Sequence, residues 1–215
     1  MRPYQHAMSS AKSRQSWTDD LPVHEFLDST KFCCADRRHR FLLHHADLGS
    51  AVAERAFPQR SDIGRLVARH VKEDLGRSAT YSDWLDRVDK NLLPRPSLRR
   101  LSAGEDHIAK LVSRKLPEDA YDSVLEVCAF LYLPSTFVDA ELEHSLPVFM
   151  NAAGPMLVRR VFGPPCSLSD SVIVDFGWIA EAIIFTLFGR IPDLSEVVGA
   201  VIEEPTKSMN GDTHA

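Results

Sequence analysis

The sequence has no run of about 18 uncharged apolar residues, the length that a membrane-spanning helix needs. The longest apolar candidate, residues 178–189, is too short and contains Glu181. The first residues also lack the basic-then-apolar pattern of a signal peptide. We therefore expect a soluble, cytoplasmic protein with no membrane partner.

Paired cysteines, nucleotide-binding loops and excess positive charge are also absent. The four cysteines form no CxxC pair, and adjacent Cys33 and Cys34 have poor geometry for a mutual disulfide, which predicts reduced thiols. The sequence has no glycine-rich phosphate loop and no GxSxG motif, so neither nucleotide triphosphate binding nor a serine nucleophile is indicated. The net charge of −5 argues against a nucleic-acid partner.

The pattern that is present is helical. Apolar residues recur at spacings of three and four, and alternating runs are scarce, so we predict an all-α helical bundle. Gly76 and Gly189 resemble glycine stops with positive φ, and Asp19 and Asp20 could cap a helix with Pro22 in its first turn. The predicted helices cover residues 5–15, 22–33, 36–57, 62–75, 81–88, 105–115, 119–132, 137–162, 170–188 and 193–203.

A repeat of a little over 100 residues runs through the chain. LGSAVAERAF (48–57) aligns with AGPMLVRRVF (153–162), and LVARHVKEDLGRSATYSDWL (66–85) aligns with IAEAIIFTLFGRIPDLSEVV (179–198). Chance similarity between amphipathic helices is the alternative, but helical patterning does not demand the matched glycines. We predict two tandem, diverged copies of one unit, packed as a pseudo-dimer in a monomer or a weak homodimer. The predicted parts are a first repeat (1–90), a linker (91–104), a degenerate second repeat (105–203) and a flexible tail (204–215).

Ionisable residues of the first copy are replaced mainly by apolar residues in the second. His44 aligns with Phe149, and His70 aligns with Ile183. Because a solvated side chain would more often be replaced by a polar one, these positions are expected to face an interior, where polar groups need partners. The replaced residues are His24, Asp28, His44, His45, His70, Glu73 and Asp74.

Three histidine–carboxylate pairs occur at helical spacing, so both members of a pair would project from one helix face. Imidazole nitrogen and carboxylate oxygen suit Zn²⁺, Fe²⁺ or Mn²⁺ inside a helical bundle. The alternative is a set of hydrogen-bonded structural histidines. On one helix over 36–57, His44 is a better partner for Asp36 than His45 is. The predicted metal ligands are His24, Asp28, Asp36, His39, His44, His45, His70 and Asp74, some of which could instead orient a ligand.

These residues favour a metal-dependent hydrolase that acts on a small anionic or phosphorylated substrate. The metal would activate water, and Glu73 could accept a proton. The anionic group could be held by Lys31, Arg37, Arg40 or Lys72, which could instead be surface charges or partners of the carboxylates. The same ligands could hold iron for oxygen chemistry. A non-catalytic interaction protein with a structural histidine–carboxylate network is a further alternative.

Three segments carry a family resemblance: PYQHAMSSAK (3–12), LPVHEFLDSTKFCCADRRHRFLLHHADLG (21–49) and HVKEDLGRSATYSDWL (70–85). Over about residues 3–88 the chain resembles a family of small helical proteins of unknown function, found largely in bacteria and phages. The resemblance implies no activity. FLLHHADLG is also similar to the LLHD-type segment of HD phosphohydrolases, although Ala46 separates His45 from Asp47. The family resemblance implies that the motif positions are His24, Asp28, Lys31, Asp36, His39, His44, His45, His70, Glu73, Asp74 and Gly76.

Overall fold

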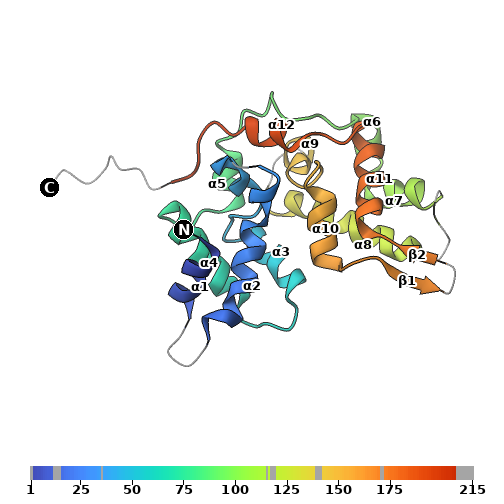
Figure 1. The fold of residues 1–215 in the computed structure, drawn as a ribbon. Helices are drawn as coiled ribbons and strands as arrows, with labels where there is room; N and C mark the ends of the chain where they lie inside the picture. Colours follow the sequence, from blue (N-terminus) through green and yellow to red (C-terminus); the bar gives the residue numbers. More distant parts are fainter. Residues whose placement is uncertain are drawn as a thin grey trace.

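The computed structural model describes residues 2–11, 16–34, 36–114, 116, 120–138, 142–169 and 172–206. Helices dominate this part of the chain, as the apolar periodicity predicts (Figure 1). Of the tail predicted over 204–215, residues 204–206 are described and the rest lies outside the described residues. None of the described helices has both the length and the apolar composition needed to cross a membrane.

The first half of the chain packs around one amphipathic helix, α4. This helix contacts α1, α2 and α3, and its buried face carries His70 among apolar residues. The elements are α1 (Pro3–Ser10), α2 (Trp17–Leu27), η1 (Asp28–Phe32), η2 (Arg37–Leu42), α3 (Leu48–Ala56), α4 (Ile63–Leu75) and α5 (Tyr81–Leu85).

The second half packs in the same manner around α11, which contacts α7, α8 and α10 (Figure 1). Its elements are α6 (Leu98–Leu101), α7 (Gly104–Ser113), α8 (Tyr121–Tyr132), η4 (Leu133–Thr136), α9 (Leu142–Ser145), η5 (Leu146–Val148), α10 (Gly154–Phe162), β1 (Cys166–Ser169), β2 (Val172–Val174), α11 (Phe176–Phe188) and α12 (Leu194–Gly199). The predicted linker therefore contains the short helix α6.

The single helix predicted over 36–57 is wrong, because a first bend (residues 43–47) separates η2 from α3. Backbone groups of this bend bond to distant residues instead of completing a helix. Trp84 Nε1 donates to the carbonyl of His44 at 3.0 Å, and the amide of Ala46 donates to the carbonyl of Ala79 at 2.7 Å. Gly49 lets the chain pack closely, since a Cβ there would collide with the Leu43 carbonyl.

The second half has a similar second bend (residues 149–153) before α10, so the helix predicted over 137–162 is also interrupted. The amide of Ala152 donates to the carbonyl of Pro192 at 2.9 Å. A Cβ at Gly154 would collide with the carbonyl of Phe149. Each bend is thus followed by a glycine that allows the next helix to pack closely on a backbone carbonyl.

Other predicted helix ends need smaller corrections. The helix predicted to begin at 22 begins at Trp17 with Ser16 as its cap, which leaves Pro22 inside the helix. The helix predicted over 170–188 begins only at Phe176, because β1 and β2 form an antiparallel hairpin before it. Gly76 and Gly189 end α4 and α11 with φ of 73° and 72°, which confirms both predicted glycine stops.

The two halves share one apolar core and join through a short antiparallel contact. Val88 and Val201 form an isolated bridge. The amide of Asp89 donates to the carbonyl of Ala200 at 2.8 Å, and the amide of Ile202 donates to the carbonyl of Arg87 at 2.8 Å. This bridge holds the end of the second half against the end of the first.

Candidate metal centre

Four of the predicted ligands converge in the first half. Asp28, His44, His70 and Asp74 each offer one donor atom, and these atoms all lie within 4.8 Å of one another. His70 and Asp74 project from α4 one turn apart, as their spacing predicts. Asp28 begins η1 directly after α2, and His44 lies in the first bend.

Most measured distances between the donor atoms are close to those around a small metal ion. His44 Nε2 lies 3.0 Å from His70 Nε2, 3.2 Å from Asp74 Oδ2 and 3.7 Å from Asp28 Oδ1. His70 Nε2 lies 3.8 Å from each of the two carboxylate oxygens. Bonds of about 2.1 Å in a tetrahedral site separate neighbouring donors by about 3.4 Å. These four residues could therefore hold a divalent ion.

The four side chains are buried, with Asp28 the most exposed at 4%. Burial opposes ionisation of Asp28, but interactions with His44 and Lys31 outweigh it and lower the pKa of Asp28. The pKa of Asp74 is likewise lowered despite burial, because His44, His6 and Arg40 favour the carboxylate. Burial lowers the pKa of His70, with help from His44 and His6. Both carboxylates and the His70 imidazole are thus in the forms that bind metal at neutral pH.

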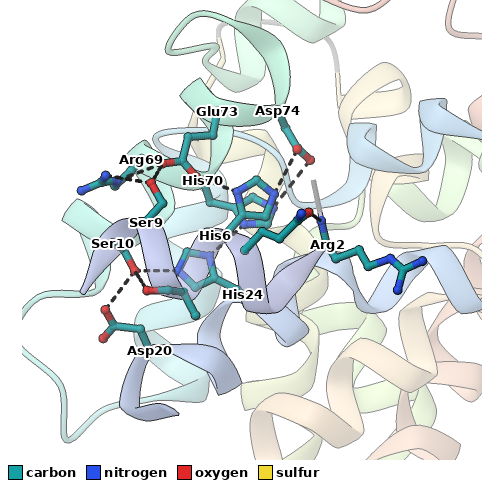
Figure 2. Close-up of polar contacts among 12 residues, drawn as sticks. Arg2, His6, Ser9, Ser10, Asp20, His24, Arg69, His70, Glu73 and Asp74 are labelled. Atoms are coloured by element: carbon teal, nitrogen blue, oxygen red, sulfur yellow. Dashed lines mark hydrogen bonds and ion pairs between the residues drawn. The ribbon is translucent and has the colours of Figure 1, made fainter. Parts of the chain in front are cut away.

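His24, a predicted ligand, lies behind His70 rather than among the four donors. Figure 2 shows the chain of contacts: His24 Nδ1 lies 2.9 Å from His70 Nδ1, and its Nε2 lies 3.1 Å from Ser10 Oγ. Ser10 Oγ donates to Asp20 Oδ2 at 2.9 Å. When His70 donates from Nδ1 along this chain, its Nε2 keeps a lone pair for a metal. His24 therefore orients His70, a candidate ligand.

Sequence reasoning missed His6, which contacts the centre from α1. His6 Nε2 lies 3.1 Å from Asp74 Oδ1, and Nδ1 lies 2.7 Å from Glu73 Oε2 (Figure 2). His6 aligns with His107 in the second half, so a comparison based on lost residues could not reveal it. Its place in the PYQHAMSSAK segment was the available signal.

The structure does not bring Asp36, His39 or His45 into the four-donor group. Asp36 is exposed, caps η2 and pairs with Arg38, whose hydrogen bonds lower the pKa of Asp36 to about 2. His39 is buried and donates from Nδ1 to the Asp36 carbonyl at 2.6 Å. The imidazole of His45 packs among aromatic rings instead of facing the four donors.

Lys31 and Arg40 are the predicted cations that contact the centre, whereas Arg37 and Lys72 are exposed. Lys31 forms an ion pair with Asp28, and Arg40 Nη2 lies 3.2 Å from Asp74 Oδ2. Glu73 accepts hydrogen bonds from His6, Ser9 and Arg69, so it contacts the centre only through His6. Two cations therefore lie beside the ligand carboxylates, one on each.

Comparisons with known proteins identify one domain. Residues 1–92 match the model of a family described as a domain of unknown function (DUF6915). This domain contains all four candidate ligands and spans the segments that carry the family resemblance. No curated protein and no solved structure matches the chain.

Proposed function

We propose that this protein is a divalent-metal-dependent hydrolase acting on a small anionic or phosphorylated molecule. The observation that carries the proposal is the convergence of two imidazole nitrogens and two carboxylate oxygens beside Lys31 and Arg40. Zn²⁺, Mn²⁺ and Fe²⁺ match this donor set. When bound, such an ion polarises the substrate and activates water.

The charge of the centre favours an anionic substrate. The carboxylates of Asp28 and Asp74 cancel the charge of a divalent ion, so Lys31 and Arg40 leave an excess of positive charge. Glu204 pairs with Arg40, but among the described residues Lys31 pairs with no carboxylate other than that of Asp28. The centre therefore attracts an anion once a divalent ion is bound. Phosphate monoesters carry the required negative charge.

Glu73 has a different role in this proposal from that of a direct proton acceptor. Its carboxylate already accepts from three side chains, and it reaches Asp74 only through His6. Glu73 therefore positions His6, and His6 positions Asp74. Lys31 holds Asp28 on the opposite side and contributes to anion binding.

Metal analysis of the purified full-length protein tests the proposal. We expect about one ion per chain and chelator-sensitive hydrolysis of p-nitrophenyl phosphate. His70→Ala and the isosteric Asp74→Asn should each lower metal affinity by more than about 100-fold, because each removes a direct ligand and loss of an outer partner alone costs 10- to 100-fold. His107→Ala, at the exposed counterpart of His6, should retain metal and activity. Absence of stoichiometric metal in the wild-type protein would overturn the proposal.

A structural metal in a non-catalytic helical protein is the second candidate. It is supported by the burial of all four donors, since closed four-ligand sites are typically structural whereas catalytic sites keep an open position. This candidate predicts that chelation lowers the melting temperature while the metal-loaded protein has no turnover. Turnover that depends on the metal would exclude it.

We also propose that residues 105–203 are a diverged second copy of residues 1–90. Two features support this. In each half, a bend is followed by a glycine that packs on a backbone carbonyl. In each half, the amide of an alanine in the bend also donates to a carbonyl that lies three residues after the glycine ending α4 or α11. An offset of 113, taken from the alignment of Gly76 with Gly189, relates Val88 to Val201. Their bridge thus pairs equivalent segments, as at a two-fold interface.

A further inference from the structure

The segment after α12 lies against the first half close to the candidate metal centre. Its path follows the Val88–Val201 bridge and the hydrogen bond from Ile202 to Arg87, and Figure 1 shows it leaving α12 beside α5. Pro205 is buried. This arrangement brings Glu204 to Arg40, with each side chain only 13% exposed.

Arg40 connects this segment to a metal ligand. Its Nη2 contacts Asp74 Oδ2 at 3.2 Å, while Nη1 lies 3.4 Å from both carboxylate oxygens of Glu204. Charge-assisted hydrogen bonds are typically about 2.7–2.9 Å long, so the contacts with Glu204 are weak. Arg40 Nε has no hydrogen-bond partner among the described residues. The guanidinium therefore has unused capacity to bind an anion.

We propose that Arg40 binds the phosphate group of the substrate, and that Glu204 occupies this subsite until a phosphate displaces it. The proposal rests on the proposed function and names the subsite for its anionic group. A phosphate dianion offers more charge than a carboxylate and suits the planar fork of a guanidinium. It would also offset the positive charge that Lys31 and Arg40 leave beside a bound ion. Glu204 offsets only part of that charge.

Glu203 provides a matched control in the next position. Its side chain is 70% exposed and forms a long ion pair of 3.6 Å with Arg87. Exposed pairs of this kind contribute little. Glu203→Gln thus makes the same chemical change in the same segment without altering the Arg40 subsite.

The experiment titrates inorganic phosphate into full-length wild type, Glu204→Gln and Glu203→Gln, with and without added Zn²⁺ or Mn²⁺. We expect Glu204→Gln to bind phosphate at least about fivefold more tightly than wild type does, because the competing carboxylate is gone. Glu203→Gln should match wild type within about twofold. Arg40→Gln should bind phosphate at least about tenfold more weakly. Phosphate should also speed hydrogen exchange at the Ile202 amide of wild type as Glu204 leaves.

Equal or weaker phosphate binding by Glu204→Gln would overturn the inference. Loss of metal from Glu204→Gln would also overturn it, since Glu204 would then support the metal centre instead of occupying a subsite. Failure of the proposed function gives a different result. If the wild-type protein binds no metal, the metal-free titration still measures competition between phosphate and Glu204, and tighter binding by Glu204→Gln would support the subsite.

Discussion

His44 and His45 are neighbours in the sequence, but their imidazoles lie in different surroundings. The His44 ring is 4.8 Å from that of His70, between ring centroids. The His45 ring contacts Tyr81 edge-on at 5.2 Å and also packs against Trp84. Neither ring nitrogen of His45 forms a well-directed hydrogen bond with the described residues. A buried imidazole without such bonds is costly.

Replacement of His45 by methionine should stabilise the protein. His45→Met removes two buried polar atoms and replaces the imidazole by a flexible apolar side chain that can fill the same space. The free energy of unfolding should therefore rise by about 1–3 kcal/mol. Met150 stands at the aligned position of the second half. Urea denaturation of both proteins measures the change. The exposed His107→Met should alter stability by less than about 0.5 kcal/mol.

The same variant should change the response to acid. Burial, together with His44 and partly offset by the Phe41 carbonyl, lowers the pKa of His45 from 6.5 to about 3. The unfolded chain therefore binds a proton that the folded protein excludes. This group leaves the free energy of unfolding unchanged above pH 6.5 and lowers it as pH falls from 6.5 toward 3, by up to about 1.4 kcal/mol per pH unit. His45→Met should lack this part of the pH dependence. A loss of metal from the variant would instead identify His45 as the ligand that the sequence suggested.

At the scale of elements, the first bend decides which histidine reaches the centre. Its backbone is held by the Trp84 indole and the Ala79 carbonyl, both far away in the sequence. The second bend has a similar backbone contact from Ala152 to Pro192. The close approach at each following glycine makes both bends sensitive to a single methyl group.

Gly49→Ala and Gly154→Ala should each lower the free energy of unfolding by about 1–3 kcal/mol, because each new Cβ meets a backbone carbonyl that cannot move freely. Gly49→Ala should also weaken metal binding, since it displaces the bend that carries His44. Gly64→Ala in α4 is the control, with only the far end of Glu54 nearby at 3.9 Å. It should be neutral or slightly stabilising in the same urea titrations. If Gly154→Ala left stability unchanged while Gly49→Ala lowered it, the two bends would not be equivalent.

At the scale of the whole molecule, the proposed duplication makes the second half an internal counterpart of a second subunit. Helices α3 and α10 contact each other across the junction of the halves. The Val88–Val201 bridge joins the end of the first half to the end of the second. Because these surfaces are already paired within one chain, light scattering at micromolar concentration should give a mass near 24.1 kDa. A stable dimer would contradict an internal pseudo-dimer.

Much of the helical architecture could be predicted because it depends on local properties. Apolar periodicity predicts α4 over 62–75 within one residue of its observed start at Ile63, and glycine at 76 and 189 predicts the stops of α4 and α11. The hairpin before α11 could not be predicted from periodicity, because its strands are only three and four residues long.

By itself, the sequence determined that the chain is helical and that His70 and Asp74 share one face of α4, since a spacing of four needs only local geometry. Only the tertiary structure decided that His44 joins them, that His24 lies one contact behind His70, and that His6 contacts Asp74. Helical spacing relates side chains within one helix. Contacts between helices depend instead on packing and on backbone hydrogen bonds between distant residues, such as the one that holds the first bend.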